Sequence, residues 1–384
     1  MHALPIAGKL VYEIGYGSTG KERFIMTNTG KYIINVRSHA DMVEGHGVLS
    51  AGKEQIRLVQ EGLADRFTVI DNCKKGGDIT HYHTVNLGYF LTLPLAKLHG
   101  RTVGYVHFLP ETIDGSLQLP RAAKAVFYRY LIAFYKSMDA LVVVNPVFIE
   151  KLAAYGIPRE KITYIPNYVD DREFHPVSAD EKRTLRKSYG LDPDRFTVVC
   201  AGQLQTRKGV LEFADLAAKM PDIQFLWAGG FSFGKMTDGY EEISKLLEQH
   251  PSNLIFTGIV PRGAMNGIYN LGDVMFLPSY DELFPMTILE AMSCQIPLLL
   301  RDIEVYPDIL FDFYCKGKTQ NEFESLLRRL QNDPAFYAAA KDGAKRGHAF
   351  YGKAHVLSMW DSFYTALATA PVLHPARHGK RVPA

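Results

Sequence analysis

Two glutamates in the second half of the chain, Glu282 and Glu290, have the surroundings of a substrate-binding site. An apolar run that predicts a buried strand ends at Pro278, a polar turn follows, and Pro285 favours the first turn of a helix. The free amides at the start of that helix, at its positive dipole end, would bind a diphosphate. Glu282 could accept hydrogen bonds from sugar hydroxyls, and Glu290, about one turn inside the helix, could hold a ribose diol. The alternative is an ordinary helix start with solvated glutamates.

A second group of chemically capable residues lies in the turn Gly202–Gly209, which follows the predicted strand Thr197–Ala201. Two adjacent cations, Arg207 and Lys208, stand there, where the diphosphate of a leaving group would be neutralised. Because the turn connects a strand to a helix, we favour a phosphate site over a solvated basic turn.

Three histidines and a glycine in the first half of the chain could contact the same substrates. His107 follows the predicted strand Thr102–Val106 and would face a cleft, unless it is a hydrogen-bonded core residue. His81 and His83 alternate by two and therefore share one face of a strand. They could ligate zinc, but no third ligand has suitable spacing, so we predict no metal and place them on the acceptor side of a cleft. The small residues around Gly47 would let the backbone approach a phosphate or sugar.

The elements that must position these residues form two series of short apolar strands, alternating with amphipathic stretches as in βαβ units. The first series is predicted at Tyr32–Val36, Phe67–Asp71, Asp78–Tyr82, Thr102–Val106, Ala140–Val144 and Ile162–Ile165, and the second at Thr197–Ala201, Ile223–Ala228, Leu254–Thr257, Val274–Leu277 and Pro297–Leu300. A polar stretch near residues 166–180 separates them. We therefore predict an α/β protein with two open parallel sheets and a ligand cleft between them.

The same pattern predicts the domain boundaries. Residues 31–175 form the first domain and residues 176–354 the second, and a helix at about 355–370 packs back on the first. Residues 1–30 are predicted to be a hairpin-like extension rather than a phosphate-binding loop, because Glu22 stands where such a loop needs a hydroxyl side chain. Residues 371–384, rich in proline and basic residues, are predicted to be a mobile tail.

Composition excludes several classes of protein. The 384 residues are 47% hydrophobic and 22% charged, as in soluble globular proteins. A net charge of only +2 argues against a nucleic-acid-binding protein. No apolar run reaches the roughly 18 residues that cross a bilayer, and no signal peptide is evident. The cysteines are far apart in sequence, which favours reduced thiols. We expect a cytoplasmic protein whose membrane contact, if any, is peripheral.

The glutamate pair, with Phe284 and Ala291-Met292 placed as they are, resembles the donor signature of glycosyltransferase family 4. Members of this family are retaining enzymes with the GT-B fold, in which two Rossmann-like domains face a central cleft. The resemblance covers about residues 32–365. It implies an acceptor domain at 31–175 and a nucleotide-sugar donor domain at 176–354.

The resemblance also implies roles for individual residues. It makes Glu282, Lys208 and His107 the catalytic positions. The implied donor-binding residues are Gly47, Gln203, Arg207, Ile259, Leu283, Phe284, Met286, Thr287 and Glu290. Three positions depart from the family pattern: Pro285 and Tyr168 each replace a usual glycine, and Gln203 replaces a usual arginine. Our hypotheses are that neighbouring amides bind the phosphate and that Arg207 compensates for the missing arginine.

The predicted helix Pro120–Met138 has an uneven distribution of residues. Phe127, Tyr130, Leu131, Phe134 and Met138 cluster on one side, whereas Arg121, Lys124, Arg129 and Lys136 cluster on another together with Tyr128, Ile132 and Tyr135. Cations mixed with exposed aromatic residues suit an anionic membrane surface. The alternative is a helix with one core face and one solvated face.

The segments Gly104–Thr112 and Val143–Pro146 resemble bacterial diacylglycerol glycosyltransferases, above all those that add a hexose to glucosyl-diacylglycerol. The implied reaction moves glucose or galactose from a UDP-sugar onto a membrane glycolipid at the inner face of the cell membrane, without a metal. Two alternatives stay open. One keeps the donor chemistry and uses a soluble saccharide or a cell-wall precursor as acceptor, and the other is a two-domain sugar-binding protein without catalysis.

Overall fold

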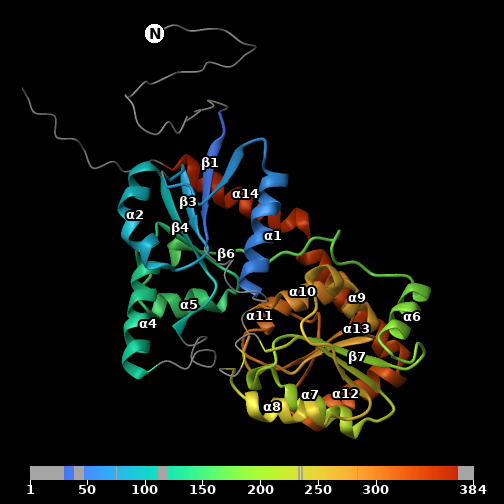
Figure 1. Cartoon of the computed structure of the whole chain (residues 1–384). Helices are drawn as coiled ribbons and strands as arrows, with labels where there is room; N and C mark the ends of the chain where they lie inside the picture. The colour runs from blue at the N-terminus through green and yellow to red at the C-terminus, as the bar shows by residue number, and fades with distance from the viewer. Residues whose placement is uncertain are drawn as a thin grey trace, which may run out of the picture.

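The computed structural model describes residues 30–38, 47–74, 76–110, 120–231, 234, 237–282 and 284–370. These residues form two six-stranded sheets in series, one in each half of the chain (Figure 1). Every pairing between their strands is parallel. The predicted tail and, apart from Gly30, the predicted N-terminal hairpin lie outside the described residues.

The first sheet has the strand order β2-β1-β3-β4-β5-β6 and the second the order β12-β11-β10-β7-β8-β9. The strands are β1 (Tyr32–Arg37), β2 (Phe67–Asp71), β3 (Ile79–Tyr82), β4 (Arg101–Val106), β5 (Ala140–Val143), β6 (Ile162–Tyr164), β7 (Thr197–Ala201), β8 (Gln224–Ala228), β9 (Leu254–Phe256), β10 (Val274–Leu277), β11 (Leu298–Arg301) and β12 (Cys315–Gly317). All the strands predicted from the sequence are confirmed, with small shifts at their ends. The edge strand β12 was missed, because its sequence Cys-Lys-Gly has no β-branched or aromatic residue.

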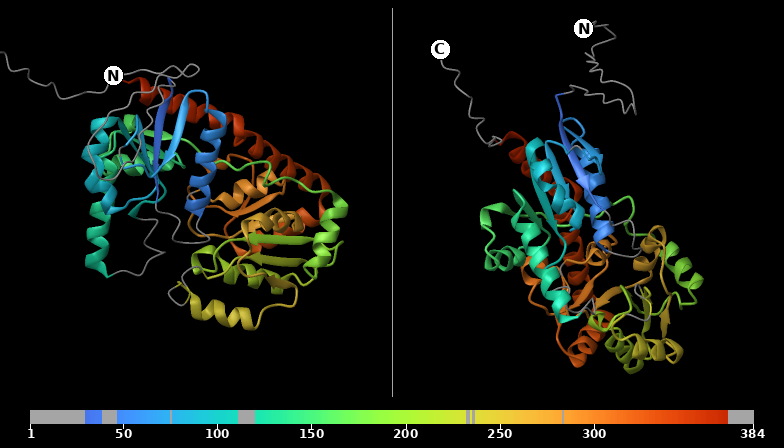
Figure 2. Two further views of the ribbon diagram at one scale, coloured as in Figure 1. Left: turned by 45° about the horizontal axis from the view of Figure 1, so that its top comes forward. Right: turned by 60° about the vertical axis from the view of Figure 1, so that its left-hand side comes forward.

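Helices cover both faces of each sheet, as parallel sheets require. They are α1 (Gly47–Gly62), α2 (Leu87–His99), α4 (Arg121–Lys136), α5 (Val147–Ala154), α6 (Ala179–Ser188), α7 (Val210–Lys219), α8 (Tyr240–Glu248), α9 (Met265–Leu271), α10 (Met286–Ser293), α11 (Pro307–Leu310), α12 (Gln320–Asn332), α13 (Pro334–Phe350) and α14 (Lys353–Thr369), with 3-10 turns η2 (Arg159–Lys161), η3 (Thr206–Lys208) and η5 (Arg262–Ala264). In Figures 1 and 2, α2 and α4 flank one side of the first sheet, and α1 and α14 flank the other.

The inner strands are buried on both faces, which explains their unbroken apolar sequences. Every residue of β5 (Ala-Leu-Val-Val) and of β10 (Val-Met-Phe-Leu) is buried. One apolar core runs from the α1 side of the first sheet, through the segment after β6, into the second sheet. The residues Ile165, Tyr168, Val169 and Phe174 of that segment belong to this core, so the two halves of the molecule share buried surface.

Helix α14 follows the second sheet in sequence but packs against α1 and β3. The Tyr364 hydroxyl accepts a hydrogen bond from Gln55 Nε2 at 2.9 Å and lies 2.7 Å from His81 Nδ1. Trp360 stacks on Tyr364 with ring centroids 5.2 Å apart. The C-terminal helix therefore helps to fix β3, the strand that precedes His83.

Helix α4 differs in one respect from the sequence expectation. Leu131, Phe134 and Met138, which cluster on the apolar side, are buried, but so is Tyr135, which was assigned to the basic face. Its hydroxyl donates to the Phe108 carbonyl at 3.0 Å, across the turn that follows β4. A tyrosine can lie inward when its hydroxyl finds such a partner, so Tyr135 is a core residue rather than an interfacial one.

Candidate active site

The loops after β7 and β10 meet at a buried ion pair. Lys208, at the end of η3, binds Glu282 Oε1 through its ammonium group, and both side chains are nearly closed to solvent. The loops can approach because Gly209 has a φ of +73°, and an added Cβ there would lie 2.8 Å from the Pro278 carbonyl oxygen. Strands β7 and β10 are neighbours in the sheet, so their carboxyl ends bring the two predicted catalytic residues together.

The charge on Glu282 is stabilised by its neighbours. Burial raises the pKa of this carboxyl group, but Lys208 and Arg207 outweigh burial and hold the pKa below its usual value. Arg207 lies beside the pair, where its Nη1 donates to the Asp281 carbonyl at 3.1 Å and its Nε to Gln205 Oε1 at 2.9 Å. The site therefore presents two cations beside the Glu282 carboxylate at the ends of adjacent strands.

Helix α10 begins directly behind this pair. Its N-cap is Pro285, which offers no side-chain cap, so the first amides of the helix, from Met286 and Thr287, lack partners within the helix. The Phe284 carbonyl accepts a hydrogen bond from Asn167 Nδ2 at 3.1 Å, which ties the segment after β6 to the loop. Leu283 lies outside the described residues.

Glu290, one turn into α10, is held by two side chains that the sequence analysis did not single out. Tyr269 on α9 donates its hydroxyl to Glu290 Oε2 at 2.5 Å, and Arg262 on η5 donates Nη1 to Oε1 at 2.9 Å. Glu290 is only 4% exposed. Neither contact has a sequence signature, because each joins separate elements through the fold.

The remaining predicted donor residues lie on the same side of the second sheet or face it from the first. Gln203 is half-buried in the loop after β7. Ile259, in the loop after β9, is 70% exposed, although an added Cβ on Gly230 would lie 2.8 Å from its Cγ1. Gly47 is the first residue of α1, whose helix contacts α10.

The three histidines form one buried cluster at the carboxyl ends of β3 and β4. The His81 and His83 rings are 4.5 Å apart and the His83 and His107 rings 5.8 Å apart, with Tyr105 packed against all three. Burial lowers the pKa of His83 to about 3 and lowers those of the other two well below the usual value, so the rings are neutral at pH 7. Both ring nitrogens of His83 and Nε2 of His107 have no hydrogen-bond partner among the described residues. His81 instead faces α14 through Tyr364.

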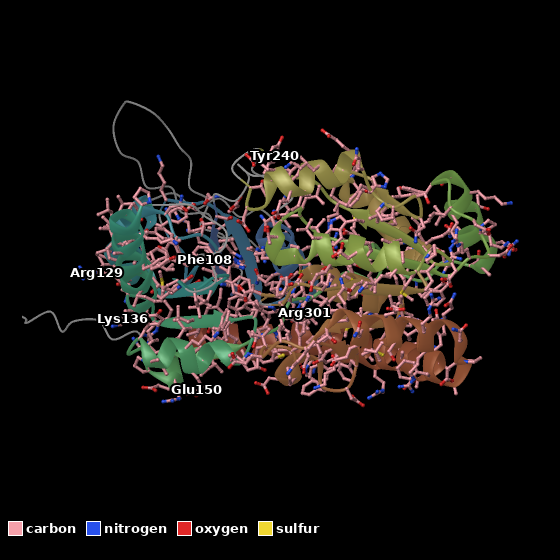
Figure 3. The ribbon with its side chains drawn as sticks, turned by 90° about the horizontal axis from the view of Figure 1, so that it is seen from below. Phe108, Arg129, Lys136, Glu150, Tyr240 and Arg301 are labelled. Atoms are coloured by element: carbon pink, nitrogen blue, oxygen red, sulfur yellow. The ribbon has the colours of Figure 1, made fainter. Side chains whose placement is uncertain are left out.

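The basic residues assigned to the acceptor or membrane are not brought to these groups. Arg121, Lys124 and Arg129 lie on α4, on the outer side of the first sheet, and Figure 3 shows Arg129 and Lys136 at that edge. Arg129 is exposed. Among the described residues, no helix combines the length and apolar character needed to cross a bilayer.

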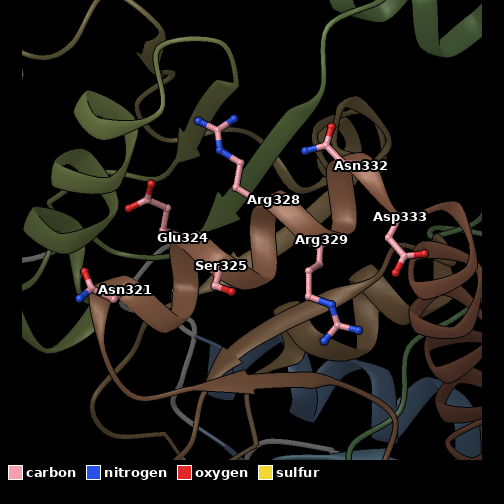
Figure 4. A pocket seen from close by; sticks show the side chains of 7 residues that line it. All are labelled: Asn321, Glu324, Ser325, Arg328, Arg329, Asn332 and Asp333. Carbon is pink, nitrogen blue, oxygen red and sulfur yellow. The ribbon is translucent and has the colours of Figure 1, made fainter.

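The described residues offer neither a second binding pocket of suitable character nor a metal-binding cluster. A surface hollow of about 520 Å³ lies along α12 (Figure 4), but its Arg328 is paired with Asp222 and Arg329 lies over the Phe336 ring at 3.9 Å. Within the described ranges, no three His, Cys, Asp or Glu side chains come close enough to hold a metal ion.

The two halves of the chain match two protein families. Residues 56–173 match the family described as Glycosyltransferase Family 4, and residues 181–347 match Glycosyl transferases group 1. A relative named alpha-galactosylglucosyldiacylglycerol synthase, from Streptococcus pneumoniae, is 46% identical over 334 residues, which are 87% of this chain and 89% of that protein. The processive diacylglycerol alpha-glucosyltransferase of Acholeplasma laidlawii is 28% identical over 260 residues, 67% of this chain and 76% of that one.

Solved structures share the fold at low sequence identity. Anabaena Alr3699/HepE, solved with UDP-glucose, aligns with a TM-score of 0.68 at 13% identity, over 87% of this chain and all of that one. The sucrose-phosphate synthase of Thermosynechococcus elongatus gives 0.70 at 16% identity, over 88% and 99% of the two chains. Two parallel sheets in series, together with the two family matches, define a glycosyltransferase with the GT-B fold. The chain belongs to glycosyltransferase family 4.

Proposed function

We propose that this enzyme transfers a hexose, glucose or galactose, from a UDP-sugar onto a membrane glycolipid such as glucosyl-diacylglycerol, with retention of the anomeric configuration. The observation that carries the proposal is the 46% identity, over nearly the whole of both chains, to a protein named as a galactosylglucosyldiacylglycerol synthase. The UDP-glucose complex of a protein with the same fold supports the choice of donor.

The second domain, residues 176–354, would bind the donor. Its diphosphate would be bound by Arg207, Lys208 and the first amides of α10, since helix N-termini and paired cations both favour anions. Glu290 would hold the ribose diol, and the exposed Ile259 offers an apolar surface for the uracil ring. No metal is needed in this proposal, because fixed cations and amides neutralise the leaving group.

Retention follows from substitution on one face of the sugar. The bond between the anomeric carbon and the UDP oxygen breaks while the acceptor hydroxyl oxygen bonds to that carbon from the same side. The acceptor proton passes to the departing phosphate oxygen, so no protein base is required. Lys208 stabilises the charge that grows on the diphosphate, and Glu282 orients the sugar hydroxyls.

The first domain, residues 31–175, would present the acceptor. His83 and His107 lie at the carboxyl ends of β3 and β4, where ligands of open α/β sheets bind. Their unpartnered ring nitrogens are neutral and can each donate to or accept from a hydroxyl group. We assign them to the sugar hydroxyls of the glycolipid head group or of the transferred hexose.

Helix α2 supplies a surface suited to lipid. Leu87, Leu91, Leu95 and Leu98 recur every three or four residues and are between 59% and 70% exposed, so they form one apolar stripe, here called the α2 leucine face. Monomeric proteins rarely leave such a stripe in water. The buried side of the helix packs against β4, and Phe90 contacts α4, with its ring 5.7 Å from that of Tyr130.

The charges around the leucine face match an anionic membrane. Neither α2 nor α4 contains an aspartate or glutamate, whereas α4 carries four cations, Arg121, Lys124, Arg129 and Lys136. Leucines that enter the interface and cations at the head groups together produce peripheral binding. We therefore propose that α2 and α4 dock the enzyme on the inner face of the cell membrane, next to its acceptor.

The experiment that tests the proposal incubates the purified protein with radiolabelled UDP-glucose, UDP-galactose and other nucleotide sugars. Each donor is paired with glucosyl-diacylglycerol in mixed micelles or with soluble saccharides. Labelled diglycosyl lipid, formed equally well in the presence of a chelator, is the expected product. Transfer only to soluble acceptors would overturn the glycolipid assignment, and binding without transfer would indicate a sugar-binding protein.

A further inference from the structure

Arg262 in η5 binds three carboxylates at once. Its Nη1 donates to Glu290 at 2.9 Å, its Nη2 to Glu54 Oε1 at 2.8 Å and its Nε to Glu173 Oε2 at 3.1 Å. A guanidinium group can do this because its donors point in fixed directions within one plane. The Phe174 ring lies 5.0 Å from the centre of the guanidinium group and covers one of its faces.

The three carboxylates belong to different parts of the molecule. Glu54 lies on α1 under the first sheet, Glu173 on the segment that joins β6 to α6, and Glu290 on α10 of the second half. Figure 1 shows α1 reaching from the first sheet towards α10. Arg262 therefore links Glu290 directly to α1 and to the segment after β6.

The contact between Arg262 and Glu54 belongs to a partly buried cluster of charges. Glu54 is only 4% exposed, and burial raises its pKa, so its charge depends on neighbouring cations. Arg57 closes the cluster by donating to Glu54 Oε2 at 2.9 Å and to Glu173 Oε1 at 2.7 Å. An isolated ion pair on the exposed surface would lack these additional partners and would contribute little to the stability of the fold.

The contacts of Glu290 leave room for a substrate. A carboxylate has about four acceptor positions, and Arg262 and Tyr269 use one on each oxygen. One position on each oxygen remains, which suits the two adjacent hydroxyls of a ribose. With Arg262 and Tyr269 in place, the carboxylate is fixed in orientation before the donor arrives.

We propose that Arg262 is a positioning residue that orients Glu290 and that, through Glu54, makes donor affinity depend on the placement of α1. This inference rests on the proposed role of Glu290 in holding the donor ribose. An ordinary interdomain ion pair would stabilise the fold without changing donor binding. The proposal instead requires that Glu54, which has no contact with Glu290 in the described structure, changes the affinity for the nucleotide.

The ribose lies away from the bond that breaks, so its contacts are the same before and during the reaction. Losing such contacts raises KM for the donor and leaves kcat nearly unchanged. For Arg262→Gln we expect UDP affinity and donor KM to worsen at least about tenfold, the effect of losing a hydrogen bond to a charged group. Arg262→Lys keeps the charge but loses the planar set of donors of the guanidinium group. Its UDP affinity should therefore lie between those of the wild type and Arg262→Gln.

The experiment measures UDP binding by titration calorimetry, donor kcat and KM, and melting temperature. The variants are Arg262→Gln, Arg262→Lys, Glu54→Gln and the double variant of Arg262→Gln with Glu54→Gln, with Arg346→Gln on exposed α13 as the control. Glu54→Gln should weaken UDP binding several-fold alone and add nothing in the Arg262→Gln background. The control should bind UDP as wild type does.

Wild-type UDP affinity in folded Arg262→Gln and Glu54→Gln proteins would overturn the inference and leave the proposed function intact. A large fall in kcat with unchanged KM would also overturn it, because that split indicates a role at the reacting centre. If the wild-type protein itself bound no UDP, the proposed function would fail, and the inference with it.

Discussion

The ammonium group of Lys208 and the carboxylate of Glu282 form an ion pair that joins the loops after two adjacent strands, β7 and β10. Because both side chains are nearly closed to solvent, removal of Glu282 leaves the Lys208 ammonium group buried without its partner, and removal of Lys208 leaves the buried Glu282 carboxylate with Arg207 alone. The pair therefore stabilises the fold in addition to its proposed role in catalysis, and substitutions must be chosen to separate the two effects.

Glu282→Ala should abolish transfer and also destabilise the protein, by about 3–5 kcal/mol, since it leaves the buried Lys208 cation without its ion-pair partner. Glu282→Gln keeps the size and hydrogen-bonding capacity of the side chain, so it should lose activity with a smaller loss of stability. Initial rates and urea denaturation of both variants provide the measurement. Near-normal turnover of folded Glu282→Gln would show that the carboxylate has no essential role.

Lys208→Ala should lower kcat by roughly 100-fold, as expected when one preorganised charge that stabilises a leaving group is lost. The double variant of Lys208→Ala and Glu282→Ala should be more stable than the sum of the single variants predicts, because no lone charge stays buried. Chemical denaturation of the four proteins gives this coupling, and additive destabilisation would contradict a buried pair.

Much of the fold could be predicted from the sequence because parallel strands buried on both faces have unbroken apolar runs, such as Val274–Leu277. The strand, turn and helix around Glu282 and Glu290 could be predicted for the same reason. The partners Arg262 and Tyr269 could not be predicted, since they reach Glu290 from η5 and α9 through tertiary packing.

Helix α2 illustrates a second limit. Its sequence, Leu-Gly-Tyr-Phe-Leu-Thr-Leu-Pro-Leu-Ala-Lys-Leu-His, is apolar on most sides, as in a helix buried all round. The structure buries only Tyr89, Leu93 and Ala96 and leaves the leucine face in solvent. Which side of such a helix is covered depends on how it lies on the sheet, where α2 packs against β4, and no local pattern encodes that choice.

The low pKa values of the buried histidines predict that the free energy of unfolding depends on pH. In the unfolded chain a histidine binds a proton below about pH 6.5, whereas folded His83 stays neutral down to about pH 3. The unfolded state therefore takes up protons first, and stability falls as pH decreases from about 6.5 towards 3. Each such histidine contributes a slope of about 1.4 kcal/mol per pH unit within this window.

His83→Gln should remove one of these protons and flatten the stability profile between pH 6 and pH 4. Urea denaturation at several pH values measures the slope directly. The expected result is one proton fewer bound on unfolding near pH 5, even if the variant is less stable overall. An unchanged slope would mean that the folded protein protonates His83 as readily as the unfolded chain does.

The leucine face predicts an apolar contribution to membrane binding that salt does not remove. The pair of changes Leu91→Ser and Leu95→Ser takes two exposed side chains out of the interface, at about 1.5 kcal/mol or more each, and should weaken vesicle binding at least about tenfold. Sedimentation with neutral and anionic vesicles provides the measurement. The melting temperature should change little, because both side chains are exposed in the free protein.

The basic residues of α4 predict the electrostatic contribution. Each cation near an anionic surface contributes about 1 kcal/mol, and salt screens it. Changing Arg121, Lys124 and Arg129 together to glutamine should therefore weaken binding to anionic vesicles by several kcal/mol at most, and this loss should shrink as salt rises. Activity on a soluble short-chain acceptor should survive, because the proposed donor site lies in the other domain.

A matched control removes the same charge elsewhere, by changing Lys341, Lys345 and Arg346 to glutamine on the exposed side of α13. If net charge alone decided membrane affinity, this control would weaken vesicle binding as much as the α4 triple variant does. If α4 faces the bilayer, only the α4 variant loses affinity, because attraction by head groups decays within a Debye length of about 8 Å. Equal binding of wild type and the α4 variant to anionic vesicles at low salt would make α4 an ordinary scaffold helix. Membrane docking would then depend on the α2 leucine face alone.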